Sequence, residues 1–316
     1  MPAPGKRRVT GQQLARQYYE TLGRPALAAH FPALVPRMAV GLAGEGSECF
    51  GFDDALSRDH DWGAGFCIWL EEDDFRQYGA QVQAVYDSLP AEKAGFPIRR
   101  QQDEYSAGRL GCLCTQHWYR RYTGFPEGPE TPAQWRRVPE AYLATVTNGT
   151  VFVDPLGRFS AVREKMCAFY PEDVRLKKLA ARAAAMAQAG QYNYPRCIKR
   201  GDMVAAQLVR AEFMRAGMSM AYLLNRRYAP FYKWMYRGLE GLPVLLRAYE
   251  QFAQLAQTPD GPRAAEQIEG ICLTVAAELR RQGLSTFRDS FLLPHAAEIL
   301  ERITDPELRR THVMEE

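Results

Sequence analysis

This sequence contains no long apolar run. No apolar stretch in its 316 residues reaches the length of about 20 residues that a membrane-spanning helix needs, and the N-terminal residues lack the apolar core of a signal peptide. The formal net charge is only +3, so composition gives no reason to expect a nucleic-acid partner. We therefore expect a cytoplasmic protein with neither a membrane partner nor a nucleic-acid partner.

Paired cysteines and clustered histidines are also missing. The seven cysteines include no Cys-x-x-Cys pair, and Cys112-x-Cys114 is the closest spacing. A structural zinc site normally takes four ligands in two close pairs, so we expect buried free thiols in a reducing compartment. The five histidines form no pattern. This disfavours a metal phosphohydrolase, which would combine His60 and Asp61 with further histidine ligands.

The sequence does contain enough apolar residues for two domains, with 47% hydrophobic and 24% charged residues. Apolar patterns predict helices over 10–22 and 71–88 and strands over 38–43, 59–70, 109–114 and 150–154. After about residue 171 nearly every segment favours a helix. We expect an α+β domain over residues 1–170, with a small mixed sheet and helices, followed by an all-α helical bundle over residues 171–316.

The most informative segment lies between residues 46 and 61. Gly46 and Ser47 suit a turn that opens a helix, where free N–H groups can receive a phosphate. After eleven further residues, Asp59 and Asp61 flank His60, and in an extended strand both carboxylates would point to the same face. Two such carboxylates are usually held by a divalent cation or share a proton. The segment therefore predicts a phosphate site beside a metal site.

A Gly-Ser pair, a spacer of this length and an Asp-x-Asp pair before an apolar strand resemble the signature of the nucleotidyltransferase superfamily. DNA polymerase beta and the aminoglycoside nucleotidyltransferases typify that superfamily. Within it, the chain is similar to a bacterial two-domain family of unknown function. That similarity rests on GSECFGFDDALSRDHDW, on NGTVFVDPLGRF and on residues 190–234. The resemblance implies a nucleotidyltransferase-like α+β domain followed by a helical bundle.

The resemblance also implies roles for individual residues. It makes Gly46 and Ser47 contacts to nucleotide phosphates, and it makes Asp59 and Asp61 ligands of one or two Mg²⁺ ions. In nucleotidyl transfer such ions bridge the phosphates, neutralise charge on the leaving pyrophosphate and activate the attacking hydroxyl.

The superfamily places a third carboxylate on a later strand. Asp154, at the end of the Val151–Val153 strand, is the first candidate, and its alternative role is a turn-former before Pro155. Glu104 is the reserve, and the strand over 109–114 carries no acid. We expect some of the other acidic residues near the motif to cap helices or pair with arginines, and we assign none of them to metal. They are Glu45, Glu48, Asp53 and Asp54.

The helical half offers three further polar candidates. Glu212 lies beside a predicted apolar stripe of Val204, Leu208 and Ala211, and a carboxylate there could be the general base for an acceptor hydroxyl. Arg200 and Lys233 could neutralise a triphosphate. The alternative for each is a solvated face that forms pairs along its own helix.

Two functions follow from these residues and from the resemblance. The first is a Mg²⁺-dependent nucleotidyltransferase that moves a nucleoside monophosphate from an NTP, with ATP the expected donor, to a hydroxyl of a small-molecule acceptor. The second is a catalytically inactive, nucleotide-binding regulatory or partner-binding protein on the same fold.

Overall fold

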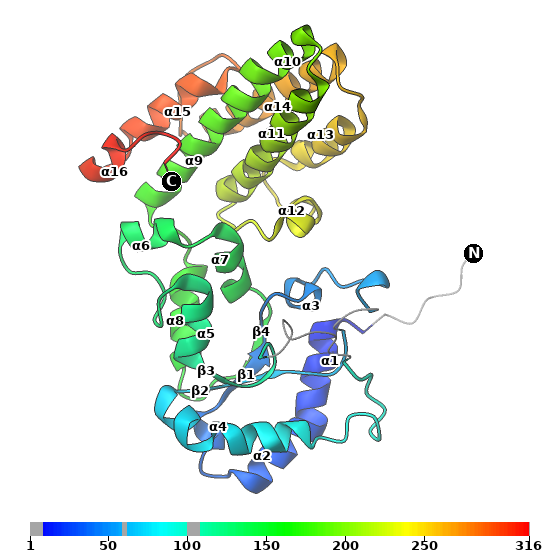
Figure 1. The fold of residues 1–316 in the computed structure, drawn as a ribbon. Helices are drawn as coiled ribbons and strands as arrows, with labels where there is room; N and C mark the ends of the chain where they lie inside the picture. The colour runs from blue at the N-terminus through cyan, green and yellow to red at the C-terminus, as the bar shows by residue number, and fades with distance from the viewer. Residues whose placement is uncertain (1–8, 59–61, 100–107, 316) are drawn as a thin grey trace. The chain divides into compact units, whose positions relative to one another are not determined.

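The computed structural model describes residues 9–58, 62–99 and 108–315. The chain forms two compact units (Figure 1). The first combines Met1–Pro129 with Tyr142–Ala168, and the second combines Glu130–Ala141 with Phe169–Glu316. A four-stranded sheet lies in the first unit, and the second is helical. The predicted fold class is confirmed, whereas the segment 130–141 belongs to the second unit although it precedes residue 170.

The sheet is mixed and has the strand order β3-β2-β1-β4. Its strands are β1 (Ala39–Leu42), β2 (Cys67–Leu70), β3 (Gly111–Cys114) and β4 (Thr150–Val153). Strand β1 pairs antiparallel with both β2 and β4, while β2 pairs parallel with β3. The start of β2, the start of β3 and the end of β1 therefore share one edge of the sheet.

Strand β2 is much shorter than predicted, because the chain before it is irregular. Gly63 has a φ of 155°, and a Cβ at this position would lie 2.6 Å from the backbone nitrogen of Arg99. The Ala64 amide donates to the Pro97 carbonyl at 2.9 Å instead of pairing within the sheet. Strand alternation therefore begins only at Cys67, and β2 does not support the prediction that Asp59 and Asp61 share a strand face.

Helices cover both faces of the sheet. Figure 1 shows α5 and α8 on one side of the strands, and α2 and α4 on the other. On the first side, the ring of Trp69 stacks on Phe159 at 4.0 Å and meets Trp118 edge-on at 5.5 Å. On the second side, Val40 and Ile68 pack with residues of α1, α2 and α4. The α-helices of this unit are α1 (Gly11–Tyr18), α2 (Arg24–His30), α3 (Ser47–Phe50), α4 (Glu72–Asp87), α5 (Thr115–Thr123) and α8 (Arg158–Cys167). Helix α7 (Glu140–Thr147) belongs to it from Tyr142 onward.

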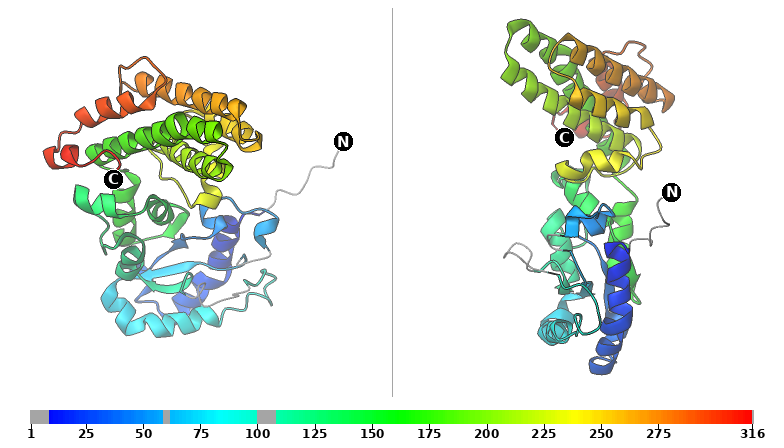
Figure 2. Two further views of the ribbon diagram at one scale, coloured as in Figure 1. Left: turned by 45° about the horizontal axis from the view of Figure 1, so that its top comes forward. Right: turned by 90° about the vertical axis from the view of Figure 1, so that its right-hand side faces the viewer.

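The second unit is built around α9, which packs against α11 and α15. Figure 2 shows α9 and α11, the green and yellow-green helices, running side by side. A π-helical segment, η5 (Ala187–Asn193), continues α9. The α-helices of the unit are α6 (Pro132–Arg137), α9 (Glu172–Met186), α10 (Tyr194–Arg200), α11 (Met203–Leu224), α12 (Tyr232–Leu239), α13 (Leu246–Gln257), α14 (Pro262–Arg281), α15 (Leu292–Glu301) and α16 (Pro306–Arg310). The sequence patterns had not predicted α6 or α8.

The predicted apolar stripe of α11 is wrong. Val204 is 72% exposed and Leu208 is 68% exposed, and Ala211 is exposed as well. The buried face instead includes Phe213 and Met220, both fully buried. The helix exists where periodicity predicted it, but a different face packs.

The cysteines and the hydropathy agree with the expectations from sequence. All seven cysteines are free thiols, and all except Cys167 are buried. None of the helices in the described part of the chain combines the length and the apolar character needed to cross a bilayer.

Candidate functional site

The Gly-Ser turn follows β1 directly and opens a helix, as predicted. Gly46 is the N-cap residue of α3, and Ser47 is its first residue. The helix ends after one turn because Gly51 adopts a left-handed conformation with a φ of 72°. The segment from Gly44 to Gly51 is called the Gly-Ser loop below.

Side chains from distant parts of the chain hold the Gly-Ser loop in place. The Asn148 amide accepts from the Gly44 N–H at 3.1 Å and donates to the Gly44 carbonyl at 2.7 Å. The Gln12 amide donates to the carbonyls of Glu48 and Cys49 at 3.1 and 3.2 Å. These anchors fix the backbone of the loop before any ligand binds. Neither Asn148 nor Gln12 is among the site residues that the sequence patterns predict.

The acidic residues around the motif pair with arginines or backbone amides, as predicted. Glu48 forms a buried ion pair with Arg99 at 2.6 Å, and Glu45 pairs with Arg109 at 3.4 Å. Asp53 accepts from the Gly11 amide at 3.0 Å, while the Asp54 carboxylate accepts from the Leu56 and Ser57 amides at 2.9 and 3.0 Å. The contacts of these four carboxylates are therefore structural.

One buried thiol, Cys49, lies in this loop and another, Cys67, lies close to it, and neither is a nucleophile. Burial raises the pKa of the Cys49 thiol well above its ordinary value, and Glu48 adds to the effect. Burial likewise raises the pKa of Cys67 to about 12. Because the thiolate is the reactive form, both side chains stay protonated and unreactive at neutral pH.

The sheet register shows which segments meet at the edge beside the Gly-Ser loop. Gly41, near the end of β1, pairs with Cys67 at the start of β2, and Cys67 pairs with Gly111 at the start of β3. Arg109 lies just before β3, which agrees with its ion pair to Glu45 in the loop. Asp59 and Asp61 precede β2 in the sequence, and they lie outside the described residues.

Asp154 lies at the opposite edge of the sheet from the Gly-Ser loop, which argues against its prediction as a third metal ligand beside that loop. Thr150 pairs with Leu42 and Val153 pairs with Val40, so β4 ends near the start of β1, about 10 Å from its end. The carboxylate of Asp154 accepts from the Gly157 and Ser160 amides at 3.0 and 2.8 Å. These contacts match the turn-forming alternative.

The described residues contain no other obvious third ligand. Strand β3 carries no acid, and Glu104 lies outside the described residues. Within residues 9–58, 62–99 and 108–315, no three His, Cys, Asp or Glu side chains are grouped so that they could hold a metal ion. The metal-binding roles of Asp59 and Asp61 stay predictions.

A small cavity adjoins the same edge. It has a volume of about 320 Å³, and its lining includes Ala64, Ile98, Arg99 and Leu110. Ala64 and Leu110 immediately precede the segments that enter β2 and β3. The volume is in the range of small-molecule sites.

The three polar candidates of the helical half all belong to the second unit. The Glu212 carboxylate pairs with Arg215 at 2.8 Å on an exposed face of α11, which is the alternative considered for it. Arg200 is exposed in the last turn of α10. The Lys233 ammonium lies 5.8 Å from the centre of the Trp234 ring. Their roles toward a nucleotide stay predictions.

Comparisons with known proteins give two similarities. A family model described as a domain of unknown function (DUF4037) matches residues 135–235, which is less than half of the chain. A nucleotidyltransferase-like protein from Exiguobacterium sibiricum is similar in structure, with 10% sequence identity over 92% of this chain and 79% of that chain and a TM-score of 0.36. At these values the structural likeness establishes no shared activity. No curated protein matches the chain.

Proposed function

We propose that this chain is a Mg²⁺-dependent nucleotidyltransferase, which moves a nucleoside monophosphate from an NTP, with ATP the expected donor, to a hydroxyl of a small-molecule acceptor. The observation that carries the proposal is the Gly-Ser loop itself. Gly46 and Ser47 open a helix directly after β1, at the sheet edge where β2 begins, and Asp59 and Asp61 precede β2 in the sequence. Chain connectivity thus supports a phosphate site and two carboxylates at one edge.

Each residue has a defined task in this proposal. Asp59 and Asp61 hold the metal ion, and Ser47 with the amides at the start of α3 contacts the phosphates. Arg109, at the same sheet edge, adds positive charge near the triphosphate. Bound Mg²⁺ would neutralise charge on the leaving pyrophosphate. The rigid anchors of the Gly-Ser loop hold the phosphate contacts in position for the acceptor hydroxyl.

The test is replacement of both aspartates. We expect Asp59→Asn with Asp61→Asn to lower Mg²⁺-dependent ATP binding and pyrophosphate release by at least about 100-fold, because even residues that only orient metal ligands contribute 10- to 100-fold. Asp73→Asn is the matched control, since that carboxylate is 97% exposed on α4. Unchanged ATP binding and pyrophosphate release in the double variant would contradict the proposal.

The second candidate is a nucleotide-binding regulatory or partner-binding protein without turnover. It is favoured by the absence of a carboxylate on β3 and by the position of Asp154 at the far edge of the sheet. The two candidates differ in one measurement. Mg²⁺-dependent ATP binding without pyrophosphate release, across a panel of hydroxyl-bearing small molecules, supports the second, whereas release with any acceptor excludes it.

A further inference from the structure

A cavity in the second unit is lined by three arginines. It has a volume of about 500 Å³, and its lining includes Arg175, Arg226 and Arg302 together with Glu172, Gln282 and two leucines. The cavity lies where α9 begins and where α11, α14 and α15 end. Three guanidinium groups against one carboxylate leave a formal charge of about +2 at neutral pH. This site is called the arginine cavity below.

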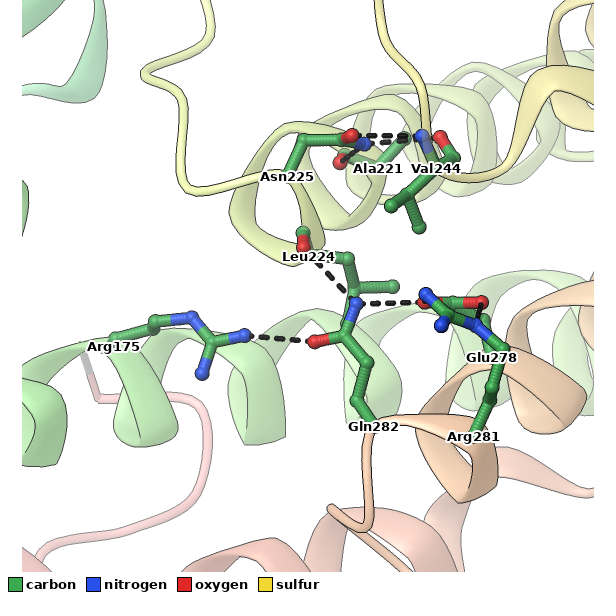
Figure 3. A network of polar contacts seen from close by, with 8 residues as sticks. All are labelled: Arg175, Ala221, Leu224, Asn225, Val244, Glu278, Arg281 and Gln282. Carbon is green, nitrogen blue, oxygen red and sulfur yellow. Dashed lines mark hydrogen bonds and ion pairs between the residues drawn. The ribbon is translucent and has the colours of Figure 1, made fainter.

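Arg175 is held rigidly in the wall of the arginine cavity. The residue is only 3% exposed. Its guanidinium donates to the Leu223 carbonyl at 3.2 Å and to the Gln282 side-chain oxygen at 3.1 Å, and it pairs with Glu172 at 2.9 Å. Figure 3 shows Gln282 between Arg175 and the Leu224 carbonyl, with Glu278 and Arg281 on the side of Gln282 away from Arg175. A buried guanidinium fixed in this way is preorganised for an anion.

Arg226 and Arg302 keep most of their donors available. A guanidinium has five N–H donors, and Arg226 uses Nη2 for Glu172 at 2.7 Å. The guanidinium of Arg302 has no partner among the residues that the structure describes. Arg226 also has a φ of 50°, just beyond the end of α11, where glycine or asparagine is the ordinary choice. A long charged residue in a strained backbone position is a local conflict of the kind found at functional sites.

Helix dipoles alone do not explain these charges. Arg226 and Arg302 follow the C-termini of α11 and α15, where positive charge is favourable. Arg175, however, lies in the first turns of α9, where the helix end is itself positive. Glu172, the one carboxylate in the lining, is shared between Arg175 and Arg226, and Asp173 accepts from Thr304 and Asp305 instead. The arginine cavity therefore has positive charge in excess of its own partners.

We propose that the arginine cavity binds a small molecule through a phosphate or diphosphate group. Planar guanidinium groups form paired hydrogen bonds with carboxylate and phosphate oxygens alike, but three of them around one cavity suit the several oxygens and concentrated charge of a phosphate or diphosphate group better than a carboxylate. The volume suits a small molecule, and Leu176 and Leu284 offer apolar contact to the remainder of the ligand. This site lies wholly within the second unit, and it does not depend on nucleotidyl transfer in the first unit.

The test uses the full chain, with isothermal titration of pyrophosphate, inorganic phosphate and succinate in the presence of EDTA, which keeps a Mg²⁺ site empty. We expect pyrophosphate and phosphate to bind more tightly than succinate. Arg226→Gly and Arg302→Ala should each weaken pyrophosphate binding by about 10-fold or more, because each removes charge-assisted hydrogen bonds. Arg226→Gly also relieves the backbone strain at this position, so we expect this variant to keep its fold.

Two controls separate this site from the proposed nucleotide site. Arg247→Ala removes an exposed arginine of α13 and should leave the pyrophosphate Kd unchanged. The Asp59→Asn with Asp61→Asn variant should also keep its pyrophosphate binding. The proposal is overturned if both arginine variants bind pyrophosphate as the unchanged chain does, if succinate binds equally well, or if only the aspartate variant loses binding.

Discussion

At the scale of single residues, the ion pair between Glu48 and Arg99 joins the Gly-Ser loop to the chain just before the described segment ends at residue 99. Both side chains are nearly buried, 6% and 13% exposed, and Glu48 directly follows Ser47. Burial by itself would lower the pKa of Arg99, but the Glu48 carboxylate raises it above its ordinary value, so the guanidinium stays charged. Such a pair is costly to break on one side, because the remaining charge stays buried.

We therefore expect Arg99→Met to lower the free energy of unfolding by about 3 kcal/mol, since it leaves the Glu48 carboxylate without its partner. Urea denaturation measures the change. The double variant Arg99→Met with Glu48→Gln should be more stable than Arg99→Met alone, because neither charge remains. If the double variant lowers the free energy of unfolding by the sum of the two single-variant losses, the two side chains do not interact.

At the scale of helices and strands, a sequence pattern can predict where a helix lies along the chain without predicting which face of that helix is buried. Two stripes of α11 have a helical period, and the one with Val204 and Leu208 is exposed. Small residues mark the face that packs. A Cβ at Gly217 would lie 2.7 Å from the Phe252 ring of α13, and one at Gly190 would lie 2.3 Å from the Phe213 ring. Close approach of neighbouring aromatic rings therefore selects the buried face.

The loop between α13 and α14 offers an element-scale test. Its Asp260 pairs with Arg210 of α11 at 3.0 Å and accepts from the Tyr194 hydroxyl of α10 at 2.8 Å. Burial alone would raise the pKa of Asp260, but the hydrogen bonds from Arg210 and Tyr194 hold it below its ordinary value. A carboxyl whose pKa is lowered in the folded state stabilises that state above its unfolded pKa of about 3.9, and this contribution is lost as the pH falls through the folded pKa.

We expect Asp260→Asn to cost about 3 kcal/mol near pH 7, because it leaves the Arg210 guanidinium largely buried without a counter-charge. The difference in unfolding free energy between the two proteins should shrink as the pH falls from 5 to 2. Urea denaturation over this pH range checks the prediction. A difference that stays constant with pH would mean that Asp260 does not titrate with folding.

At the scale of the whole molecule, the two units are not simply consecutive in the sequence. Helix α6 belongs to the second unit, although the segment after it, from Tyr142, returns to the first. Trp135 of α6 is 4% exposed and meets the Tyr170 ring at 5.7 Å, while Arg136 pairs with Glu315. The second unit thus contains a helix that precedes the last strand of the sheet.

This division predicts where the effects of core substitutions are confined. Trp135→Ala should destabilise the second unit by about 3–5 kcal/mol, the usual cost of removing a buried tryptophan side chain. Hydrogen exchange read by mass spectrometry should then rise in α9 and α11, with little change in β1–β3. Trp118→Ala is the reciprocal control, because it removes a tryptophan side chain of α5 that is only 5% exposed. This variant should raise hydrogen exchange in the sheet. Equal effects of both variants on both units would contradict the division.

The sequence alone determined the local features of this protein. These features depend on neighbouring residues, whose periodicity and turn chemistry can be read directly from the sequence. They are the positions of β1, β3 and β4, the capping of α1 by Thr10, the Gly-Ser turn at the start of α3 and the helical second half. The fold class followed from those elements.

Only the tertiary structure decided what depends on pairing between distant segments. The antiparallel register of β4 on β1 carries Asp154 to the far edge of the sheet, although its place at a strand end had made it a ligand candidate. The burial of Phe213 rather than Leu208 follows from neighbouring helices, and the arginine cavity gathers Arg175, Arg226 and Arg302 from the ends of separate helices. Contacts between distant segments determine the strand register, the buried face of each helix and the grouping of helix ends. Local sequence patterns therefore do not predict these features.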